Sequence, residues 1–329
     1  MNNILVTGGA GYIGSHIIEI LIKQKHNVFI VDDLSTGYKR LINKKAKFYK
    51  SNINNLKKIK KIIKVNKIDS IIHLAASVTV NNSKKNNKLF YNNNVKGTST
   101  VIKACKYSLV KNFIFSSTAA VYESSNKKVS ELSRVKPQSI YGLSKLKAEK
   151  IIAKQLQKLK INYAILRFFN VVGASTSQKI GPLKKNDTLF KNISMALFTQ
   201  KKEIKIYGNN LNTKDGTCIR DYIHVSDLSE IHINVLNKIK KLKKSVILNC
   251  GYGVGASVRQ VVDEFIKYSK KEANVIILKK RPADIVSSIA NNYKLKKFIK
   301  WKPKFNNLSL IVKNCLKWEK KLQKITKNY

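Results

Sequence analysis

The first half of the chain alternates short, β-branched apolar runs with longer segments of helical periodicity. Continuous apolar runs are typical of parallel strands buried on both faces, and such strands need helical crossovers between them. The strand candidates are residues 3–8, 27–33, 70–76, 112–118 and 163–170, with a further one much later at 246–251. This alternation predicts an α/β fold with a doubly wound parallel sheet and right-handed crossovers.

A glycine-rich turn links the first predicted strand to the first predicted helix. In VTGGAGYIGSH, Gly8, Gly11 and Gly14 have the spacing G-x-x-G-x-x-G. Glycines in such a turn let backbone N–H groups approach a pyrophosphate at the positive end of the helix. Asp32, at the end of the next strand, is placed to accept hydrogen bonds from a ribose 2′-hydroxyl and would repel a 2′-phosphate. We therefore predict a Rossmann-type site for NAD rather than NADP.

The strand–helix rhythm ends near residue 170. We predict an NAD-binding Rossmann domain over residues 1–170, with a returning segment around 220–250. Residues 171–329 are predicted to form mainly a smaller α/β domain that binds the substrate. Ligands of doubly wound sheets bind beyond the carboxyl ends of the strands, so the strand-end tails TGGAG, DD, AAS, SST and FFN should line one crevice.

Three tyrosines precede a lysine by four residues, in the pairs Tyr107/Lys111, Tyr141/Lys145 and Tyr293/Lys297. Lysine and arginine are so abundant here that chance alone produces such pairs, and spacing does not distinguish them. Context does, because only Tyr141 begins a helix one crossover after a strand that ends at Thr118. A lysine one helical turn away lies on the same face and lowers the pKa of a tyrosine. Tyr141 and Lys145 are therefore predicted to be a catalytic acid/base pair.

The net charge of +47 raises the alternative of a polyanion-binding protein. The lysines, however, are spread over nearly the whole length without a basic block, so we expect a solvated basic surface and no specific nucleic-acid partner. The four cysteines lie far apart without metal-ligand spacing, which predicts reduced thiols and no metal. With no signal-like start and no apolar run long enough for a bilayer, we expect a soluble, cytoplasmic protein.

A series of motifs extends from the glycine turn nearly to Trp318. They are DDLSTG, NNNVKGT, FSSTAAVY, P-x-S-x-YGLSK, RFFNVVGA, DGTCIRDYIHVSDL and CGYGVGASV. With these motifs in this order, the chain resembles the extended short-chain dehydrogenase/reductases and, within them, the nucleotide-sugar epimerases. The resemblance implies interconversion of UDP-glucose and UDP-galactose at C4 with a tightly bound, recycling NAD, in a homodimer formed through long helices that flank the sheet.

The resemblance also implies a role for each catalytic residue. As phenolate, Tyr141 takes the proton of the sugar 4-hydroxyl while C4 gives hydride to NAD⁺, and the 4-keto sugar then turns over and takes the hydride back on its other face. Lys145 lowers the pKa of Tyr141 and holds the nicotinamide ribose, and Thr118 hydrogen-bonds the 4-oxygen.

Further binding residues follow from the same motifs. Those expected at the cofactor are Gly8, Gly11, Tyr12, Ile13, Gly14, Asp32, Asp33, Ser35, Thr36, Gly37, Asn52, Ile53, Leu74, Ala75, Ala76, Asn94, Ser116, Tyr141, Lys145 and Phe168. Those expected at the UDP-sugar are Thr118, Tyr141, Asn170, Thr188, Leu189, Tyr207, Arg220, Arg281, Asp284 and Ser288. Among these, the two arginines clamp the diphosphate, for which the guanidinium fork is suited. Tyr207 stacks on the uracil, and Asn94 lies near the sugar and diphosphate.

Several positions depart from the family pattern, namely Asn52, Val78, Asn82, Glu123 and Thr188. A departure with a direct consequence is Ser288, which aligns with a bulky tyrosine that commonly narrows the sugar pocket. The smaller side chain leaves room for a 2-acetamido group. We therefore predict that the chain also converts UDP-N-acetylglucosamine and UDP-N-acetylgalactosamine.

Two rival functions remain open from the sequence. A nucleotide-sugar dehydratase or decarboxylase of the same superfamily is the nearer one, but dehydratases need an acid/base pair directly after the catalytic threonine, where this chain has Ala119 and Ala120. The other rival is a non-enzymatic NAD-sensing or polyanion-binding protein. Such proteins often lose the tyrosine or the lysine, and both are present here.

Overall fold

The computed structural model describes residues 1–78, 87–183, 188–198, 202–281 and 285–326. Its centre is a seven-stranded sheet with the order β10-β6-β5-β4-β1-β2-β3, in which all neighbours pair in parallel. The strands are β1 Asn3–Thr7, β2 Asn27–Asp32, β3 Lys47–Lys50, β4 Ser70–His73, β5 Asn112–Thr118, β6 Asn162–Phe168 and β10 Val246–Cys250. The predicted fold class is confirmed, and β3 is an addition to it.

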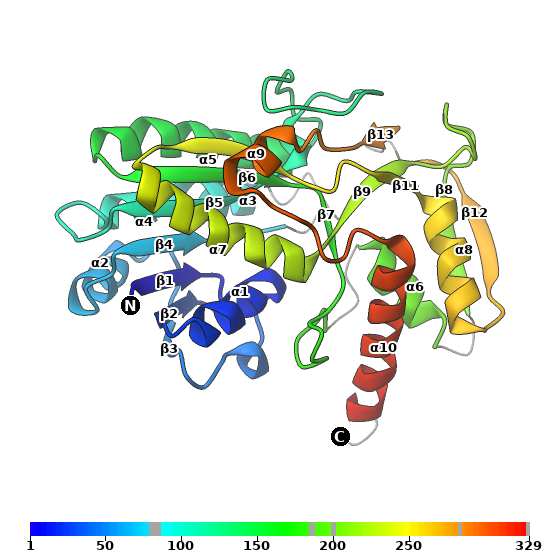
Figure 1. Cartoon of the computed structure of the whole chain (residues 1–329), viewed down its shortest axis with the longest axis horizontal. Helices are drawn as coiled ribbons and strands as arrows, with labels where there is room; N and C mark the ends of the chain where they lie inside the picture. The colour runs from blue at the N-terminus through cyan, green and yellow to red at the C-terminus, as the bar shows by residue number, and fades with distance from the viewer. Residues whose placement is uncertain (79–86, 184–187, 199–201, 282–284, 327–329) are drawn as a thin grey trace.

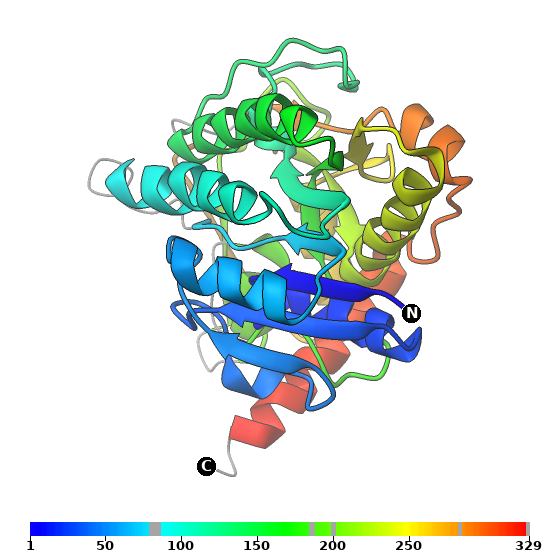
Figure 2. The same cartoon turned by 90° about the vertical axis from the view of Figure 1, so that its left-hand side faces the viewer.

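Helices cover both faces of this sheet (Figure 2). One face carries α1 Tyr12–Lys23 and α7 Val225–Leu242, and the other carries α2 Leu56–Val65, α4 Thr98–Ala104 and α5 Ile140–Lys158. Each face has its own apolar core beneath these helices. Short elements continue the second layer, namely α3 Asn87–Phe90 and the π-helix η2 Tyr91–Gly97, and the 3₁₀ turns are η1 Lys39–Leu41 and η3 Ala119–Val121.

The remaining elements gather beyond one end of the large sheet (Figure 1). A four-stranded sheet contains β7 Asn170–Val172, β9 Ile219–His224, β11 Gly255–Ser257 and β13 Ser287–Ser288, and a two-stranded one pairs β8 Glu203–Tyr207 with β12 Asn274–Leu278. Their helices are α6 Leu189–Ala196, α8 Val258–Ser269 and α10 Leu308–Thr326, while α9 Tyr293–Ile299 packs on α7 and β10. No helix of the described ranges is long and apolar enough to cross a membrane.

The strand predicted at 246–251 lies in the main sheet as β10, next to β6. The chain thus enters the outlying sheets after β6, returns to the large sheet with α7 and β10, and then leaves it again for β11. The predicted domain boundary at residue 170 remains a prediction, because the core on the α1/α7 face continues without interruption into the outlying elements.

Candidate active site

The glycine turn forms a cradle at the point where the strand order reverses, between β1 and β4. Gly8 has φ +72°, and a Cβ there would lie 2.7 Å from the backbone nitrogen of Ala75. A Cβ on Gly14 would collide with the carbonyl oxygen of Gly8. Helix α1 begins at Gly11 with no side-chain cap among the described residues, so its first amides are available to an anion. The cradle therefore fits the pyrophosphate of a dinucleotide.

Asp32 fastens this cradle to the end of β2. Its two carboxylate oxygens accept the backbone N–H groups of Ala10, at 3.0 Å, and Leu34, at 2.8 Å. Burial raises the pKa of Asp32, and these two hydrogen bonds oppose that rise. The carboxylate thus has a structural role that the sequence did not reveal, and its contact with a ribose remains a prediction.

Asp33 and Asn52 form the rim of the predicted adenosine end. Burial alone would raise the pKa of Asp33, but hydrogen bonds from Ser35 and from the Asn52 amide, the latter at 2.8 Å, bring it below its usual value. The Asn52 side-chain oxygen, expected to face the adenine amine, accepts the Asn54 N–H at 2.9 Å. Asn52 is therefore ordered by its own loop.

Asn94 is buried on the π-helix, between the crevice and α5. Its amide oxygen accepts the Ser77 N–H at 2.7 Å, and its amide nitrogen donates to the Ser77 carbonyl and to the Ser144 hydroxyl at 2.9 Å. In this arrangement Asn94 holds the loop after β4 against the helix that carries Tyr141. A direct contact with the diphosphate remains a prediction.

Tyr141 and Lys145 lie on the first turns of α5, directly opposite the end of β5. The helix begins at Ser139, whose hydroxyl accepts the Gly142 N–H at 3.1 Å. The Tyr141 hydroxyl lies near the Thr118 side chain, and Lys145 Nζ donates to the Ser116 carbonyl at 2.7 Å. The structure thus brings the three predicted catalytic residues together.

The pKa values of this pair differ from the expectation. Burial raises the pKa of Tyr141 to about 12, against a lowering by its bond to Thr118. Burial lowers the pKa of Lys145 to about 7, which the Glu149 carboxylate opposes. The pKa of Tyr141 thus lies above its ordinary value because the phenol is buried, and a lowering of that pKa by Lys145 remains a prediction.

The two other pairs with the same spacing lie on the surface. Tyr107 is 87% exposed and Tyr293 is 70% exposed, and neither adjoins the carboxyl end of a strand. Position in the fold, and not spacing, separates the dyad from these coincidences.

A cavity of about 250 Å³ opens beside Thr118, between the ends of β5 and β6 and the outlying strands β9 and β13. Predicted substrate residues that line it are Thr118, Asn170, Arg220 and Ser288. Arg220 is held in place because its guanidinium donates to the Ile219 carbonyl at 2.9 Å. Lining residues that the sequence reasoning missed are Tyr122, Gln138, Ser139 and Phe169.

Other predicted substrate residues lie outside this cavity. The Arg281 guanidinium stacks over the Tyr207 ring at 4.9 Å, at the end of β8, so the predicted diphosphate and uracil residues are neighbours. Thr188 and Leu189 begin α6. Asp284, and Asn82, which departs from the family pattern, lie outside the described residues.

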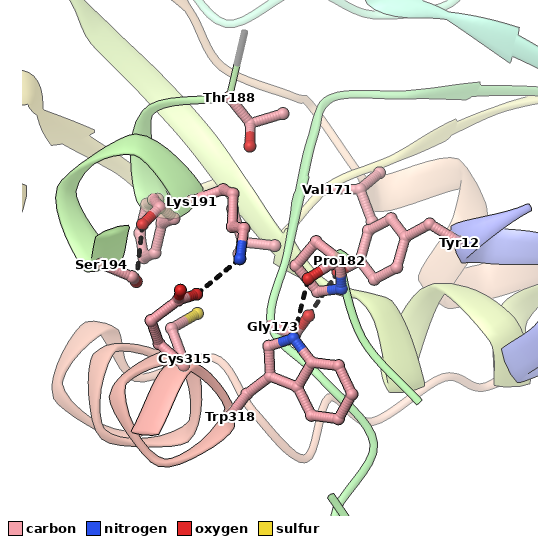
Figure 3. A pocket seen from close by; sticks show the side chains of 12 residues that line it. Tyr12, Val171, Gly173, Pro182, Thr188, Lys191, Ser194, Cys315 and Trp318 are labelled. Carbon is pink, nitrogen blue, oxygen red and sulfur yellow. Dashed lines mark hydrogen bonds and ion pairs between the residues drawn. The ribbon is translucent and has the colours of Figure 1, made fainter. Parts of the chain in front are cut away.

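A second cavity lies between Tyr12, Gly173 and α10 (Figure 3). Its volume of about 20 Å³ has room for a single water, so it cannot take a nucleotide sugar. Lys191 forms a buried ion pair there with Glu319 at 2.6 Å, and the Tyr12 hydroxyl donates to the Gly173 carbonyl. Tyr12, predicted at the cofactor, thus also ties α1 to the outlying region.

A parallel sheet with a glycine cradle at its switch point, and a tyrosine–lysine pair next to a threonine that lines a cavity, define a dinucleotide-dependent enzyme that moves a proton and a hydride. Residues 4–251 match the family described as NAD dependent epimerase/dehydratase. The chain belongs to this family. The predicted resemblance and the NAD cofactor are thereby confirmed.

Individual relatives are similar along almost the entire chain. A UDP-glucose 4-epimerase of Lactobacillus helveticus is 35% identical over 96% of this chain and 97% of its own length. The structure of a UDP-glucose 4-epimerase from Stenotrophomonas maltophila, with bound NAD and formylated UDP-arabinopyranose, has a TM-score of 0.94 at 29% identity and covers 99% of this chain and 100% of that one. The UDP-Glc/GlcNAc 4-epimerase of Campylobacter jejuni has a TM-score of 0.84 at 35% identity and covers 98% of this chain and 100% of that one.

Proposed function

We propose that this enzyme interconverts UDP-glucose and UDP-galactose at C4 through a transient 4-keto sugar, with Tyr141 as the acid/base. The observation that carries the proposal is the placement of Tyr141 and Lys145 against the end of β5, where Thr118 lines a cavity of about 250 Å³. Relatives named UDP-glucose 4-epimerase that match nearly the whole chain support the same reaction.

In this reaction each residue around the cavity has a separate role. NAD supplies the hydride acceptor and donor when it is bound at the glycine cradle. Tyr141 accepts the proton of the 4-hydroxyl and later returns it, and Thr118 holds the 4-oxygen. Arg220 and Arg281 bind the diphosphate, so the sugar can turn about its phosphate linkage and present its other face.

Lys145 supports Tyr141 by its charge. With a pKa of about 7, the ammonium form is well populated at neutral pH, and it favours the phenolate over the phenol. Activity therefore requires a deprotonated Tyr141 together with a protonated Lys145, and we expect a bell-shaped dependence of kcat on pH.

The structure argues against the dehydratase rival. Ala119 and Ala120 line the cavity directly after Thr118, in the turn η3. Their side chains carry no group that could exchange a proton with C5 or C6 of the sugar. A polyanion-binding role would need tight oligonucleotide binding that survives physiological salt and blocks turnover, whereas binding that disappears with salt would reflect only the net charge of +47.

The decisive experiment incubates the purified protein with UDP-galactose and, separately, with UDP-N-acetylgalactosamine, and resolves the epimers by chromatography. Formation of UDP-glucose without added NAD supports the proposed reaction and a tightly held cofactor. Absence of any epimer, with NAD present and the fold intact, would overturn it.

Substrate breadth is the finer part of the proposal. Ser288 lines the cavity with Arg220 and Thr118, and its small side chain leaves space on that wall. The similarity to the Campylobacter jejuni UDP-Glc/GlcNAc epimerase supports conversion of both sugar pairs.

Ser288→Tyr is expected to impair the conversion of the acetylated pair strongly and to spare that of UDP-galactose. A bulky ring on the cavity wall would collide with a 2-acetamido group, and kcat/KM for UDP-N-acetylgalactosamine should fall by roughly 100-fold. Ser287→Ala, at the preceding position of the same strand and on the same cavity wall, adds no bulk; as the matched control it should leave kcat/KM for both sugar pairs unchanged. Undetectable turnover of the acetylated pair by the unaltered enzyme would contradict the proposed breadth.

We further propose a cytoplasmic homodimer. The outer faces of α3, η2 and α5 expose Leu89, Tyr91 and Leu143, and an interface across these helices would cover them. Light scattering coupled to size-exclusion chromatography tests the oligomeric state. The four cysteines are all buried and unpaired, which suits a reducing compartment.

A further inference from the structure

Helix α5 carries a buried carboxylate one turn after Lys145. Glu149 is only 4% exposed, and its partner Arg167, on β6, is equally buried. The guanidinium donates from Nε to both carboxylate oxygens, at 3.0 and 3.2 Å, and from Nη2 to Oε2 at 2.6 Å. The hydroxyl of Ser117, on β5, donates a further hydrogen bond to Oε1. Three elements of the fold thus meet on one carboxylate.

Stability alone does not account for such a pair. Removing two charges from water costs several kcal/mol per ion, and apolar residues of the same volume often stabilise a core as well or better. This chain has only 18 acidic residues, yet one of them is buried beside the catalytic lysine. A geometric role at the dyad would account for its position.

The contact with Ser117 connects the pair to the chemistry. Ser117 lies between Ser116, whose carbonyl accepts a hydrogen bond from Lys145 Nζ, and Thr118, whose side chain lies near the Tyr141 hydroxyl. Fixing the Ser117 side chain to α5 sets the end of β5 against the helix. The hydrogen bond between Ser117 and Glu149 therefore fixes the positions of both Ser116, next to Lys145, and Thr118, next to Tyr141.

The same network extends to the wall of the substrate cavity. Arg167 Nη1 donates to the Tyr122 hydroxyl at 3.1 Å, and that hydroxyl donates to the Asn249 side-chain oxygen at 2.6 Å. Asn249 in turn donates to the Val129 carbonyl at 2.9 Å. Val129 pairs with the segment that follows Ser288, and both Tyr122 and Val129 line the cavity.

We propose that Glu149 and Arg167 are a positioning pair that aligns Lys145, Ser116 and Thr118 with Tyr141 and couples them to the substrate wall. This inference rests on the proposed function, because it assigns these two residues to the acid/base site of that reaction. Neither residue touches the substrate; they act through Ser117 and Tyr122.

The pair also bears on the charge of Lys145. The Glu149 carboxylate opposes the lowering of the Lys145 pKa by burial. Of the described residues, His73 on β4 also faces Lys145, as do the Ser116 carbonyl and the Phe115 ring on β5, and Tyr141 lies one helical turn before it on α5. Glu149 is the anion of this set, so its removal should make the ammonium form less stable.

The test is the double variant Glu149→Gln/Arg167→Met, which removes both charges and so leaves no unpaired buried ion. We expect kcat to fall by roughly 100-fold with little change in KM, because the reacting groups lose their alignment. The limb of the kcat profile that reports the ionisation of Lys145 should move to lower pH, since Lys145 loses its neighbouring anion. Glu149→Gln alone should show the same direction of both effects.

The matched control is Lys191→Met/Glu319→Gln, which neutralises an ion pair of comparable burial that does not line the substrate cavity. It should lower the melting temperature about as much as the test variant and leave kcat and the pH profile unchanged. If the Glu149/Arg167 variant behaves like this control, the positioning role is overturned.

A readout without turnover separates this proposal from the proposed function. Tyrosinate absorbance of the NAD-bound protein, taken as the difference from Tyr141→Phe, follows the ionisation of Tyr141 alone. In the Glu149/Arg167 variant its midpoint should rise, because a neutral Lys145 no longer favours the phenolate. An unchanged midpoint refutes the positioning pair, whether or not UDP-galactose is converted.

Discussion

Tyr141→Phe is expected to fold, to retain NAD and to lose roughly 10³-fold in kcat for UDP-galactose, within the usual range for removal of an acid/base group. The phenylalanine ring keeps the packing against Phe90, whose centroid lies 6.2 Å from that of Tyr141. Only the hydroxyl beside Thr118 is lost. The measurements are turnover by epimer chromatography, bound NAD after denaturation, and the melting temperature.

The matched control is Tyr107→Phe, because Tyr107 has the same spacing to a lysine and is 87% exposed. Its turnover should equal that of the unaltered enzyme. Full activity in Tyr141→Phe would end the proposed mechanism, whereas loss of NAD in that variant would show that the tyrosine serves the cofactor site instead.

Tyr141→Phe should also change how the stability of the protein depends on pH. Because burial raises the pKa of Tyr141 from 10.0 in the unfolded chain to about 12, the folded state holds this proton more tightly. The resulting stabilisation is complete below pH 10 and is lost as the pH rises toward 12. Tyr141→Phe should therefore lose less stability over that interval than the unaltered protein.

The sequence predicted most of the sheet because its strands are continuous β-branched runs. β3 was missed for a physical reason: Lys47–Lys50 reads KFYK, and as an edge strand it is only partly buried. The π-helix at Tyr91–Gly97 also has no local signal, since it is a change in hydrogen-bond register within an ordinary helical pattern. The position of a strand at the edge of a sheet and the hydrogen-bond register of a helix depend on neighbouring elements. The hydrophobic periodicity of a single segment does not reveal those neighbours.

The same limit applies to the site. The dyad and the glycine cradle depend on residues close in sequence, and position relative to a predicted strand was enough to find them. The Glu149–Arg167 pair joins residues 18 apart across two elements, and neither residue lies in a spacing that indicates a contact. The raised pKa of Tyr141 was not predicted, because a neighbouring lysine can be read from the sequence, while the burial of the phenol cannot.

Lys145→Met is expected to reduce kcat by at least roughly 100-fold and, at the same time, to stabilise the fold at low pH. Burial lowers the pKa of Lys145 from 10.5 to about 7, so the folded protein holds this proton less tightly than the unfolded chain. The buried lysine therefore destabilises the fold fully below pH 7, and this penalty disappears as the pH rises toward 10.5. Methionine has a similar length and no charge.

The melting temperature of Lys145→Met, relative to the unaltered protein, should consequently be highest at about pH 6 and should decline toward pH 10. Loss of the 2.7 Å hydrogen bond to the Ser116 carbonyl removes about 1 kcal/mol at every pH and so leaves this slope intact. Lys111→Met, at the exposed lysine of the Tyr107 pair, should show neither the slope nor the loss of turnover. A Lys145→Met variant that is less stable at pH 6 than at pH 9, relative to the unaltered protein, would mean that Lys145 keeps its charge in the fold. A variant that is more stable at pH 6 but turns over less substrate would identify Lys145 as a residue retained for catalysis, although its burial lowers the stability of the fold.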